Sequence, residues 1–203
     1  MAKICLIGAS GNIGREIKRE ALVRGHQLTG IARNLEKLPA EPGLTPAAGD
    51  IAAPAQLATL LKGADVVVAC VKWTDNAPEL LEAVRTAGVT RLIVVVGAGS
   101  LDAAPGIKVI DTPEFPPAWK TGAQGAFRAL DTFRAETTID WVAFSPSWTI
   151  APGERTGKFR VGGDQLLRNA AGESLISRED FAVAILDEIE TPKHHQQRVT
   201  VGY

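Results

Sequence analysis

Three glycines near the start of the chain, Gly8, Gly11 and Gly14, have the spacing of a phosphate-binding turn. An apolar run of strand length, residues 3 to 7, precedes them, and an amphipathic helical pattern follows. The first N–H groups of a helix have no partner inside the helix, and the helix dipole favours negative charge there. The expected chemistry is therefore the binding of a pyrophosphate by backbone amides.

The order of the glycines is G-x-x-G-x-x-G, whereas the common dinucleotide fingerprint is G-x-G-x-x-G. The physical roles are the same: Gly8 permits a tight turn, Gly11 lets the backbone approach phosphate, and Gly14 allows the helix to pack closely on the strand. A chance cluster of glycines in a loop is the alternative. The strand before and the helix after favour a nucleotide site.

The residue after the second predicted strand, residues 27 to 32, is Arg33. Sites that prefer NAD carry an Asp or Glu here, which accepts from the ribose 2′-OH, whereas an Arg pairs with the 2′-phosphate of NADP. The sequence favours NADP, with NAD possible because Glu36 lies close by. The alternative is that Arg33 is a solvated loop residue.

The third predicted strand, residues 44 to 49, is followed by Asp50 and Ile51. We expect this pair to contact the adenine ring, and Asp50 alternatively or additionally to serve as a turn or N-cap residue before a helix at 54–61. Residues 72 to 74 follow the next strand, and we expect all three to line the crevice that holds the middle of the cofactor.

Strand-like and helix-like segments alternate along most of the chain, which predicts an α/β fold: a doubly wound, Rossmann-type parallel sheet with helices on both faces. A length of 203 residues fits one domain. Residues 146–180 form a small C-terminal extension on the substrate side. Within it we expect two short strands, 158–161 and 165–167, joined by a turn, and a final helix that Ser177 opens with Asp180 at capping-box spacing.

Residues 102–119 hold four prolines and show little periodicity, so we expect neither a strand nor a long helix there. Long irregular loops in compact domains are usually functional, and we interpret this one as part of a substrate wall or a lid. A surface insertion without function is the alternative.

The formal net charge of −1 gives no electrostatic basis for binding nucleic acid or an anionic membrane. No apolar stretch is long enough to span a bilayer, and we expect a cytoplasmic protein with a small-molecule partner. Cys5 and Cys70 fall in apolar runs, where we expect buried thiols and no metal site. The oligomeric state stays open.

Several segments together resemble the atypical short-chain dehydrogenase/reductases, the group that contains NmrA-like proteins and biliverdin-IXβ and flavin reductases. The segments are GASGNIG at 8–14, Arg33, GD at 49–50, GADVVVACV at 63–71, RLIVVVGAGSL at 91–101 and SPSWTIAPGERTGKF at 145–159. The resemblance covers almost the whole chain and implies a Rossmann core that binds NAD(P)H. The cofactor contacts it implies are Gly8, Ser10, Gly11, Asn12, Ile13, Arg33, Asp50, Ile51, Cys70 and Val71.

The chain departs from the wider superfamily at the proton donor. Relatives that reduce ketones or epimerise sugars use a Tyr in Y-x-x-x-K, whose Lys lowers the pKa of the Tyr. Here Tyr203 is the only tyrosine, and Pro116 stands four residues before Lys120. A flavin or quinone, which draws its proton from water, is still reducible by hydride alone.

Two functions follow from this sequence. The first is NADPH-dependent reduction of a flavin, quinone or similar conjugated acceptor by direct hydride transfer. The second is a non-catalytic NAD(P)-binding redox sensor. Candidates for the substrate side, each with an alternative role in a loop or in packing, are Ser100, Lys120, Ser147 and Trp148.

Overall fold

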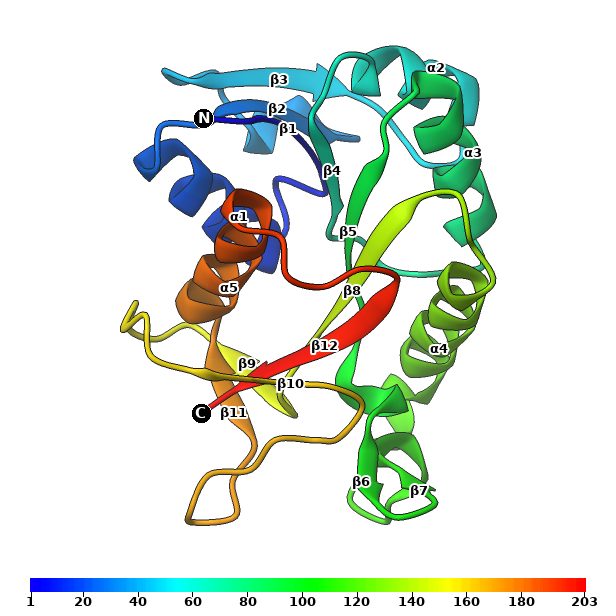
Figure 1. Cartoon of the computed structure of the whole chain (residues 1–203), viewed down its shortest axis with the longest axis vertical. Helices are drawn as coiled ribbons and strands as arrows, with labels where there is room; N and C mark the ends of the chain where they lie inside the picture. The colour runs from blue at the N-terminus through cyan, green and yellow to red at the C-terminus, as the bar shows by residue number, and fades with distance from the viewer.

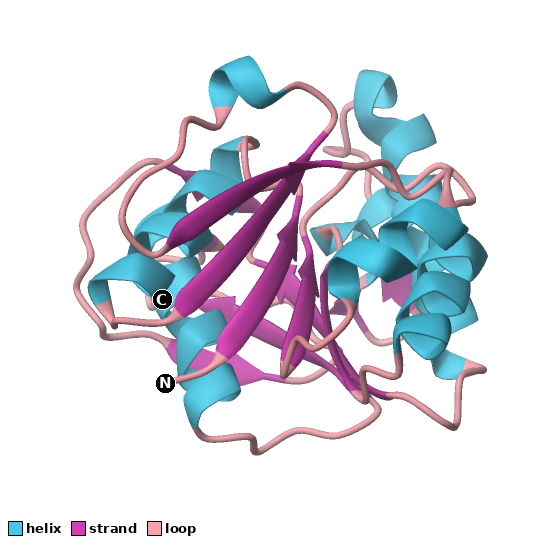
Figure 2. Ribbon diagram, turned by 90° about the horizontal axis from the view of Figure 1, so that it is seen from above, coloured by secondary structure: helices cyan, strands magenta, loops and turns pink.

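In the computed structural model, which describes residues 1–203, one eight-stranded sheet lies between two layers of helices (Figure 1, Figure 2). The strand order is β10-β12-β8-β5-β4-β1-β2-β3. All neighbours are parallel except β10 and β12. The strands are β1 (Lys3–Ile7), β2 (Gln27–Ala32), β3 (Leu44–Ala48), β4 (Val66–Ala69), β5 (Arg91–Val95), β8 (Asp140–Pro146), β10 (Arg160–Gly162) and β12 (Gln197–Gly202).

The helices cover both faces of this sheet, which confirms the predicted doubly wound architecture. On one face lie α1 (Asn12–Val23) and α5 (Arg178–Glu190), and on the other α2 (Pro54–Leu61), α3 (Ala77–Ala87) and α4 (Lys120–Arg134) (Figure 1). Side chains alternate between the two cores, as the pleat of a strand requires. Thus Cys5 and Ile7 pack with α2 and α3, whereas Ile4 and Leu6 pack with α1 and α5.

The order of the strands reverses between β1 and β4, which are hydrogen-bonded neighbours. The chain leaves β1 for α1 on one face and leaves β4 for α3 on the other. The connections diverge at the carboxyl ends of these strands and leave a crevice, which is where ligands bind in open α/β sheets.

The segment 102–119 contains a small hairpin, so the prediction that it holds no strand was wrong. In it β6 (Asp102–Ala104) pairs antiparallel with β7 (Ile107–Lys108). Gly106 closes the turn with a φ of 74°, and the Lys108 ammonium donates to the Asp102 carboxylate at 2.6 Å. The segment also contains two short 3-10 turns, η3 (Val109–Asp111) and η4 (Pro117–Trp119). Two more lie elsewhere in the chain, η1 (Leu35–Lys37) and η2 (Ala98–Ser100).

The predicted hairpin of 158–161 with 165–167 was also wrong. Instead β10 pairs with the last strand, β12, and residues 165–167 form no strand. A second small sheet, which the sequence did not predict, joins β9 (Thr149–Ala151) to β11 (Leu175–Ser177) in parallel. The predicted cap is confirmed, because the Ser177 hydroxyl accepts from the Asp180 N–H at 3.0 Å.

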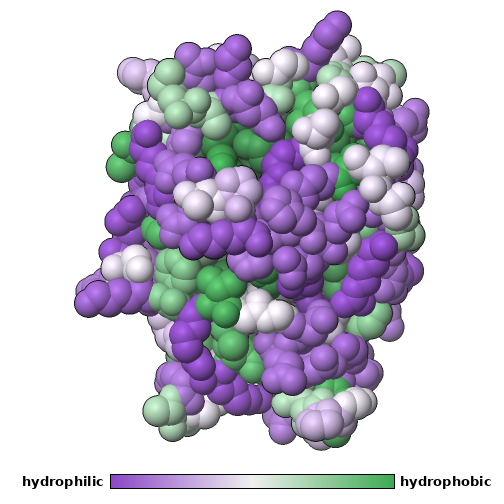
Figure 3. All heavy atoms as spheres, in the orientation of Figure 1, coloured by the Kyte–Doolittle hydropathy of each residue, from purple (hydrophilic) through white to green (hydrophobic).

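The face of the molecule shown in Figure 3 is mostly hydrophilic, and hydrophobic side chains show through in small separate areas. None of the helices combines the length and the apolar character that crossing a membrane requires.

Candidate functional site

A cavity of about 620 Å³ lies at the carboxyl ends of β1, β2, β3 and β4, at the point where the strand order reverses. Eight of the ten predicted cofactor contacts line it: Gly8, Ser10, Gly11, Arg33, Asp50, Ile51, Cys70 and Val71. Asn12 and Ile13 do not line it. They lie in the first turn of α1, where the Asn12 side chain accepts from Arg15 at 3.0 Å and Ile13 packs against the core. We call this cavity the nucleotide pocket.

The glycine turn has the close packing that its sequence predicts. Gly8 has a φ of +85°, and a Cβ on it would lie 2.1 Å from the carbonyl oxygen of Cys70. A Cβ on Gly14 would lie 2.1 Å from the carbonyl oxygen of Gly8. Gly11 is the N-cap of α1, and no side chain caps the helix. The N-terminus of α1 is therefore open toward a ligand in the pocket.

Arg33 is exposed at the edge of the nucleotide pocket. Glu36, the nearby acid, is engaged elsewhere, because its carboxylate accepts from the Asn34 side-chain amide at 3.3 Å and its N–H donates to the Asn34 Oδ1 at 2.8 Å. Asp50 has the predicted turn role, since its Oδ1 accepts from the Ala52 N–H at 3.1 Å. The carboxylate also lines the pocket beside Ile51, so both roles predicted for Asp50 are sterically compatible.

Glu79, in the first turn of α3, also lines the nucleotide pocket and was not predicted. Its Oε2 is buried and has no hydrogen-bond partner within the chain. An unpaired buried carboxylate oxygen is costly, and an amino or hydroxyl group of a ligand would satisfy it. The sequence signal that could have identified Glu79 is an acidic residue at the third position of a helix that follows a central strand.

These groups fit a nicotinamide dinucleotide. The open helix N-terminus and the exposed Arg33 suit phosphate groups, whereas Asp50 and the orphaned oxygen of Glu79 suit amino and hydroxyl donors. The volume is in the range of ordinary cofactor and ligand sites.

The segment after β4 was predicted to line the crevice with Lys72, Trp73 and Thr74, and the prediction was wrong for Trp73. Lys72 and Thr74 line the nucleotide pocket, but Trp73 is buried at 3% exposure. Its indole Nε1–H donates to the Val95 carbonyl at 2.7 Å, and its ring meets Phe133 edge-on at 5.3 Å. Successive side chains of an extended segment point to opposite sides, so an inward Trp73 leaves its two neighbours facing the pocket.

A second cavity of about 430 Å³ adjoins the nucleotide pocket, and Lys72 lines both. We call it the aromatic pocket because Phe115, Trp119 and Trp148 contribute to its wall. Phe115 and Trp148 meet edge-on at 5.7 Å, with an angle of 81° between their rings. The proline-rich segment therefore does form a pocket wall. Its residues there are Val109, Phe115, Ala118 and Trp119.

Of the four predicted substrate-side residues, only Trp148 lines the aromatic pocket. Ser100 is buried, and its hydroxyl accepts from the Arg198 guanidinium at 2.8 Å. Ser147 is fully buried and donates to the Val201 carbonyl at 3.0 Å. Lys120 is exposed at the start of α4 and lines neither pocket. Phe115 and Trp119 were missed, because nothing local in the sequence says that the segment folds back over α4.

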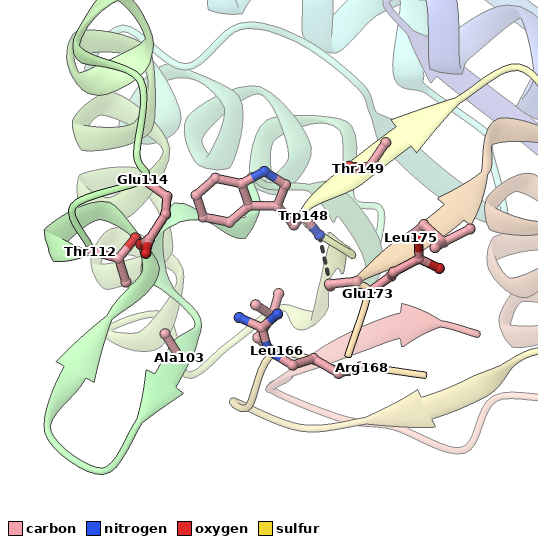
Figure 4. A pocket seen from close by; sticks show the side chains of 10 residues that line it. Ala103, Thr112, Glu114, Trp148, Thr149, Leu166, Arg168, Glu173 and Leu175 are labelled. Atoms are coloured by element: carbon pink, nitrogen blue, oxygen red, sulfur yellow. Dashed lines mark hydrogen bonds between the residues drawn. The ribbon is translucent and has the colours of Figure 1, made fainter. Parts of the chain in front are cut away.

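Trp148 also lines a third cavity of about 720 Å³ (Figure 4). In this view the indole reaches across toward Thr112 and Glu114. The backbone N–H of Trp148 donates to the Ser174 hydroxyl at 3.0 Å. Trp148 therefore lies between the aromatic pocket and this third cavity, which Arg168 and Glu173 also line.

The only tyrosine, Tyr203, makes a structural hydrogen bond away from the pockets. The Tyr203 hydroxyl donates to the Asp180 carboxylate at 2.8 Å, and burial raises the pKa of that hydroxyl. Tyr203 lines none of these three cavities.

Comparison with known proteins gives relatives along the whole chain. The chain is 37% identical to the uncharacterized protein YwnB of Bacillus subtilis, over 98% of this chain and 97% of that protein. Among solved structures, a "putative exported protein" from Burkholderia pseudomallei shares 41% identity with a TM-score of 0.92, and each chain is covered completely. A "putative epimerase" from Bacteroides thetaiotaomicron shares 39% identity with a TM-score of 0.95, over 100% of this chain and 97% of that one.

A "putative NADH-flavin reductase" from Streptococcus pneumoniae shares 30% identity with a TM-score of 0.84, over 100% of this chain and 99% of that one. The family model described as NAD(P)H-binding matches residues 8–192, which include the glycine turn, the segment after β4 and the aromatic wall. The chain belongs to this NAD(P)H-binding family.

Proposed function

We propose that this protein is an NADPH-dependent reductase of a flavin, quinone or similar conjugated acceptor. The observation that carries the proposal is that the nucleotide pocket and the aromatic pocket adjoin and share Lys72. Such an arrangement brings a nicotinamide ring and a planar acceptor together, which supplies the proximity and orientation that hydride transfer needs.

The residues of the nucleotide pocket have separate roles in this proposal. The glycine turn and the N-terminus of α1 hold the pyrophosphate, Arg33 pairs with the 2′-phosphate, and Asp50 and Glu79 accept from the adenosine half. When bound, the cofactor supplies the hydride. The preference for NADP over NAD rests on Arg33 and on the engagement of Glu36 by Asn34.

The acceptor is assigned from the wall of the aromatic pocket. Phe115, Trp119 and Trp148 offer ring faces and edges to a planar molecule, and Lys72 is the single ionisable residue among the lining residues. Without a tyrosine or carboxylic acid in this pocket, an acceptor that takes its proton from water fits best. The name of the Streptococcus pneumoniae relative, "putative NADH-flavin reductase", supports a flavin as acceptor, although it gives NADH as the cofactor.

The domain organisation and the cellular location of the chain are also part of this proposal. We treat residues 1–203 as one domain in which residues 146–180 are the substrate-side extension, and the support is that Trp148 from this segment lines the aromatic pocket. A small-molecule partner and a cytoplasmic location belong to this proposal.

Turnover separates this proposal from the redox-sensor alternative. Under air-free conditions, the loss of NADPH absorbance is followed with riboflavin, FMN and menadione in excess over protein, and the rate without protein is subtracted. Many cycles per protein molecule with at least one acceptor are expected. Tight binding of NADPH and NADP⁺ with no turnover of any acceptor would instead identify a redox sensor.

A further inference from the structure

The backbone that carries Lys72 is held from two sides. Gly125 of α4 approaches the Trp73 carbonyl so closely that a Cβ on Gly125 would lie 2.3 Å from that oxygen. Asp75 has a φ of 60°, in the left-handed region, and its carboxylate accepts from the Arg128 guanidinium at 2.5 and 3.2 Å. A bidentate pair of this kind fixes orientation as well as distance. The segment around Lys72 is therefore fixed against α4 before any ligand binds.

Lys72 itself has no partner of opposite charge. The lysines that form ion pairs within the chain are Lys18 and Lys108. Asp75, the nearest acid in sequence, is paired with Arg128, and the other acids of the nucleotide pocket, Asp50 and Glu79, belong to other elements. Lys72 is exposed and lines both pockets, so a lysine without an ion-pair partner lies where the two pockets meet.

We infer that Lys72 is the residue that stabilises the negative charge formed on the acceptor during reduction, an inference that rests on the proposed function. A planar acceptor that gains a hydride becomes an anion, with the new charge on a ring nitrogen or oxygen. The Lys72 ammonium donates a hydrogen bond to that atom, and water then supplies the proton that neutralises it. Positive charge placed where negative charge develops is among the largest contributions to catalysis.

No other lining residue of the aromatic pocket carries a positive charge. The remaining side chains are aromatic or aliphatic apart from the Thr121 hydroxyl. Lys72 itself is exposed, and an acceptor that fills the aromatic pocket excludes water from around the ammonium, which strengthens the interaction between the two charges. In this chain Lys72 thus partly compensates for the missing tyrosine, as an electrostatic stabiliser rather than as a proton donor.

The first test measures binding and needs no turnover. 4-Nitrophenol is a planar ring whose ionisation is visible in its absorbance, and its apparent pKa is measured when bound to protein saturated with NADP⁺. The variants are Lys72→Met, Lys72→Arg and, as a control on the exposed end of α2, Lys62→Met. We expect the apparent pKa of the bound phenol to be about one unit lower in the unaltered protein than in Lys72→Met, as for any acid beside an opposite charge. Lys72→Arg and Lys62→Met should match the unaltered protein.

The second test compares turnover with cofactor affinity. We expect Lys72→Met to lower kcat for riboflavin at least tenfold and to change the Kd for NADP⁺ less than twofold, with substantial rescue by Lys72→Arg. The opposite pattern, weak NADP⁺ binding with an unchanged kcat, would make Lys72 a phosphate ligand and overturn the inference. A phenol that does not bind, or that ionises identically in Lys72→Met, would overturn it as well. Absence of turnover in the unaltered protein would overturn the proposed function, while the phenol measurement would still decide whether Lys72 stabilises an anion.

Discussion

The indole N–H of Trp73 donates a 2.7 Å hydrogen bond to the carbonyl oxygen of Val95. This bond joins the segment after β4, which borders the nucleotide pocket, to the end of β5, which leads into the aromatic pocket. Both partners are buried, so the bond is shielded from water. Within the core, this bond ties the backbone beside the nucleotide pocket to the backbone that leads into the aromatic pocket.

Two glycines of α4 provide a test of the close contact that supports this segment. We predict that Gly125→Ala lowers the free energy of unfolding by about 2 kcal/mol, because its Cβ would lie 2.3 Å from the Trp73 carbonyl oxygen. Gly122→Ala is the matched control in the same helix, has open space around its Cβ, and should raise that free energy by about 0.5–1 kcal/mol. Urea unfolding measures both. Equal effects of the two substitutions would show that the contact is absent.

Arg33 is expected to determine the choice of cofactor. Removing a charged hydrogen-bond partner costs about 1.5–3 kcal/mol, so Arg33→Ala should weaken NADPH binding at least tenfold and leave NADH binding almost unchanged. Tryptophan fluorescence follows the titrations, and Arg19→Ala, an exposed position of α1, is the control. If the unaltered protein binds NADPH and NADH equally well, Arg33 does not select the cofactor.

Both thiols should be unreactive in the folded protein. Burial raises the pKa of the Cys70 thiol to about 12, and burial also raises that of Cys5. Cys5 is buried as predicted, whereas Cys70 is only half-buried and lines the nucleotide pocket, so the prediction of a buried thiol was wrong for Cys70. The raised pKa of each thiol still leaves little of the reactive thiolate at pH 8. Ellman's reagent should label no cysteine of the native chain within minutes and two cysteines after unfolding in urea. Rapid labelling of one thiol in the native state would contradict this expectation.

Glu136 should make the stability of the protein depend on acid pH. Burial acts to raise its pKa, but hydrogen bonds from Thr138 at 2.6 Å and from Arg85 at 2.8 Å outweigh burial and lower the pKa to about 2. A lowered pKa in the folded state means that the stabilisation is complete above about pH 4.5 and is lost as the pH falls toward 2.

We therefore predict that Glu136→Gln lowers the free energy of unfolding by about 2 kcal/mol at pH 7 and that its deficit shrinks below pH 4. Urea unfolding at a series of pH values checks this, with the exposed Glu82→Gln on α3 as control. A deficit that stays constant down to pH 3 would exclude the ionised carboxylate as its cause.

The sequence predicts well those features that depend on neighbours along the chain. The glycine turn and the hydrogen bond from the Asp180 N–H to Ser177 need only residues a few positions apart. The pairing of β10 with β12 depends on segments about forty residues apart, and the local turn signal at 162–164 pointed to the wrong partner.

The same distinction explains the candidate site. The residues of the nucleotide pocket lie next to strand ends that the sequence identifies, and eight of the ten predicted residues line that pocket. The substrate-side residues depend on which way single side chains turn. Ser100 turns inward because it meets Arg198, which is 98 positions away in the sequence, and no local pattern encodes such a contact.

A crystal structure of the protein with NADP⁺ tests the central claim most directly, because the claim concerns what faces the nicotinamide. We predict that the pyrophosphate lies on the glycine turn at Gly11 and that the nicotinamide ring lies beside Lys72 with one face open to the pocket of Phe115 and Trp148. A nicotinamide ring that points to solvent, or an aromatic pocket that closes when the cofactor binds, would contradict the assignment of this protein as a reductase.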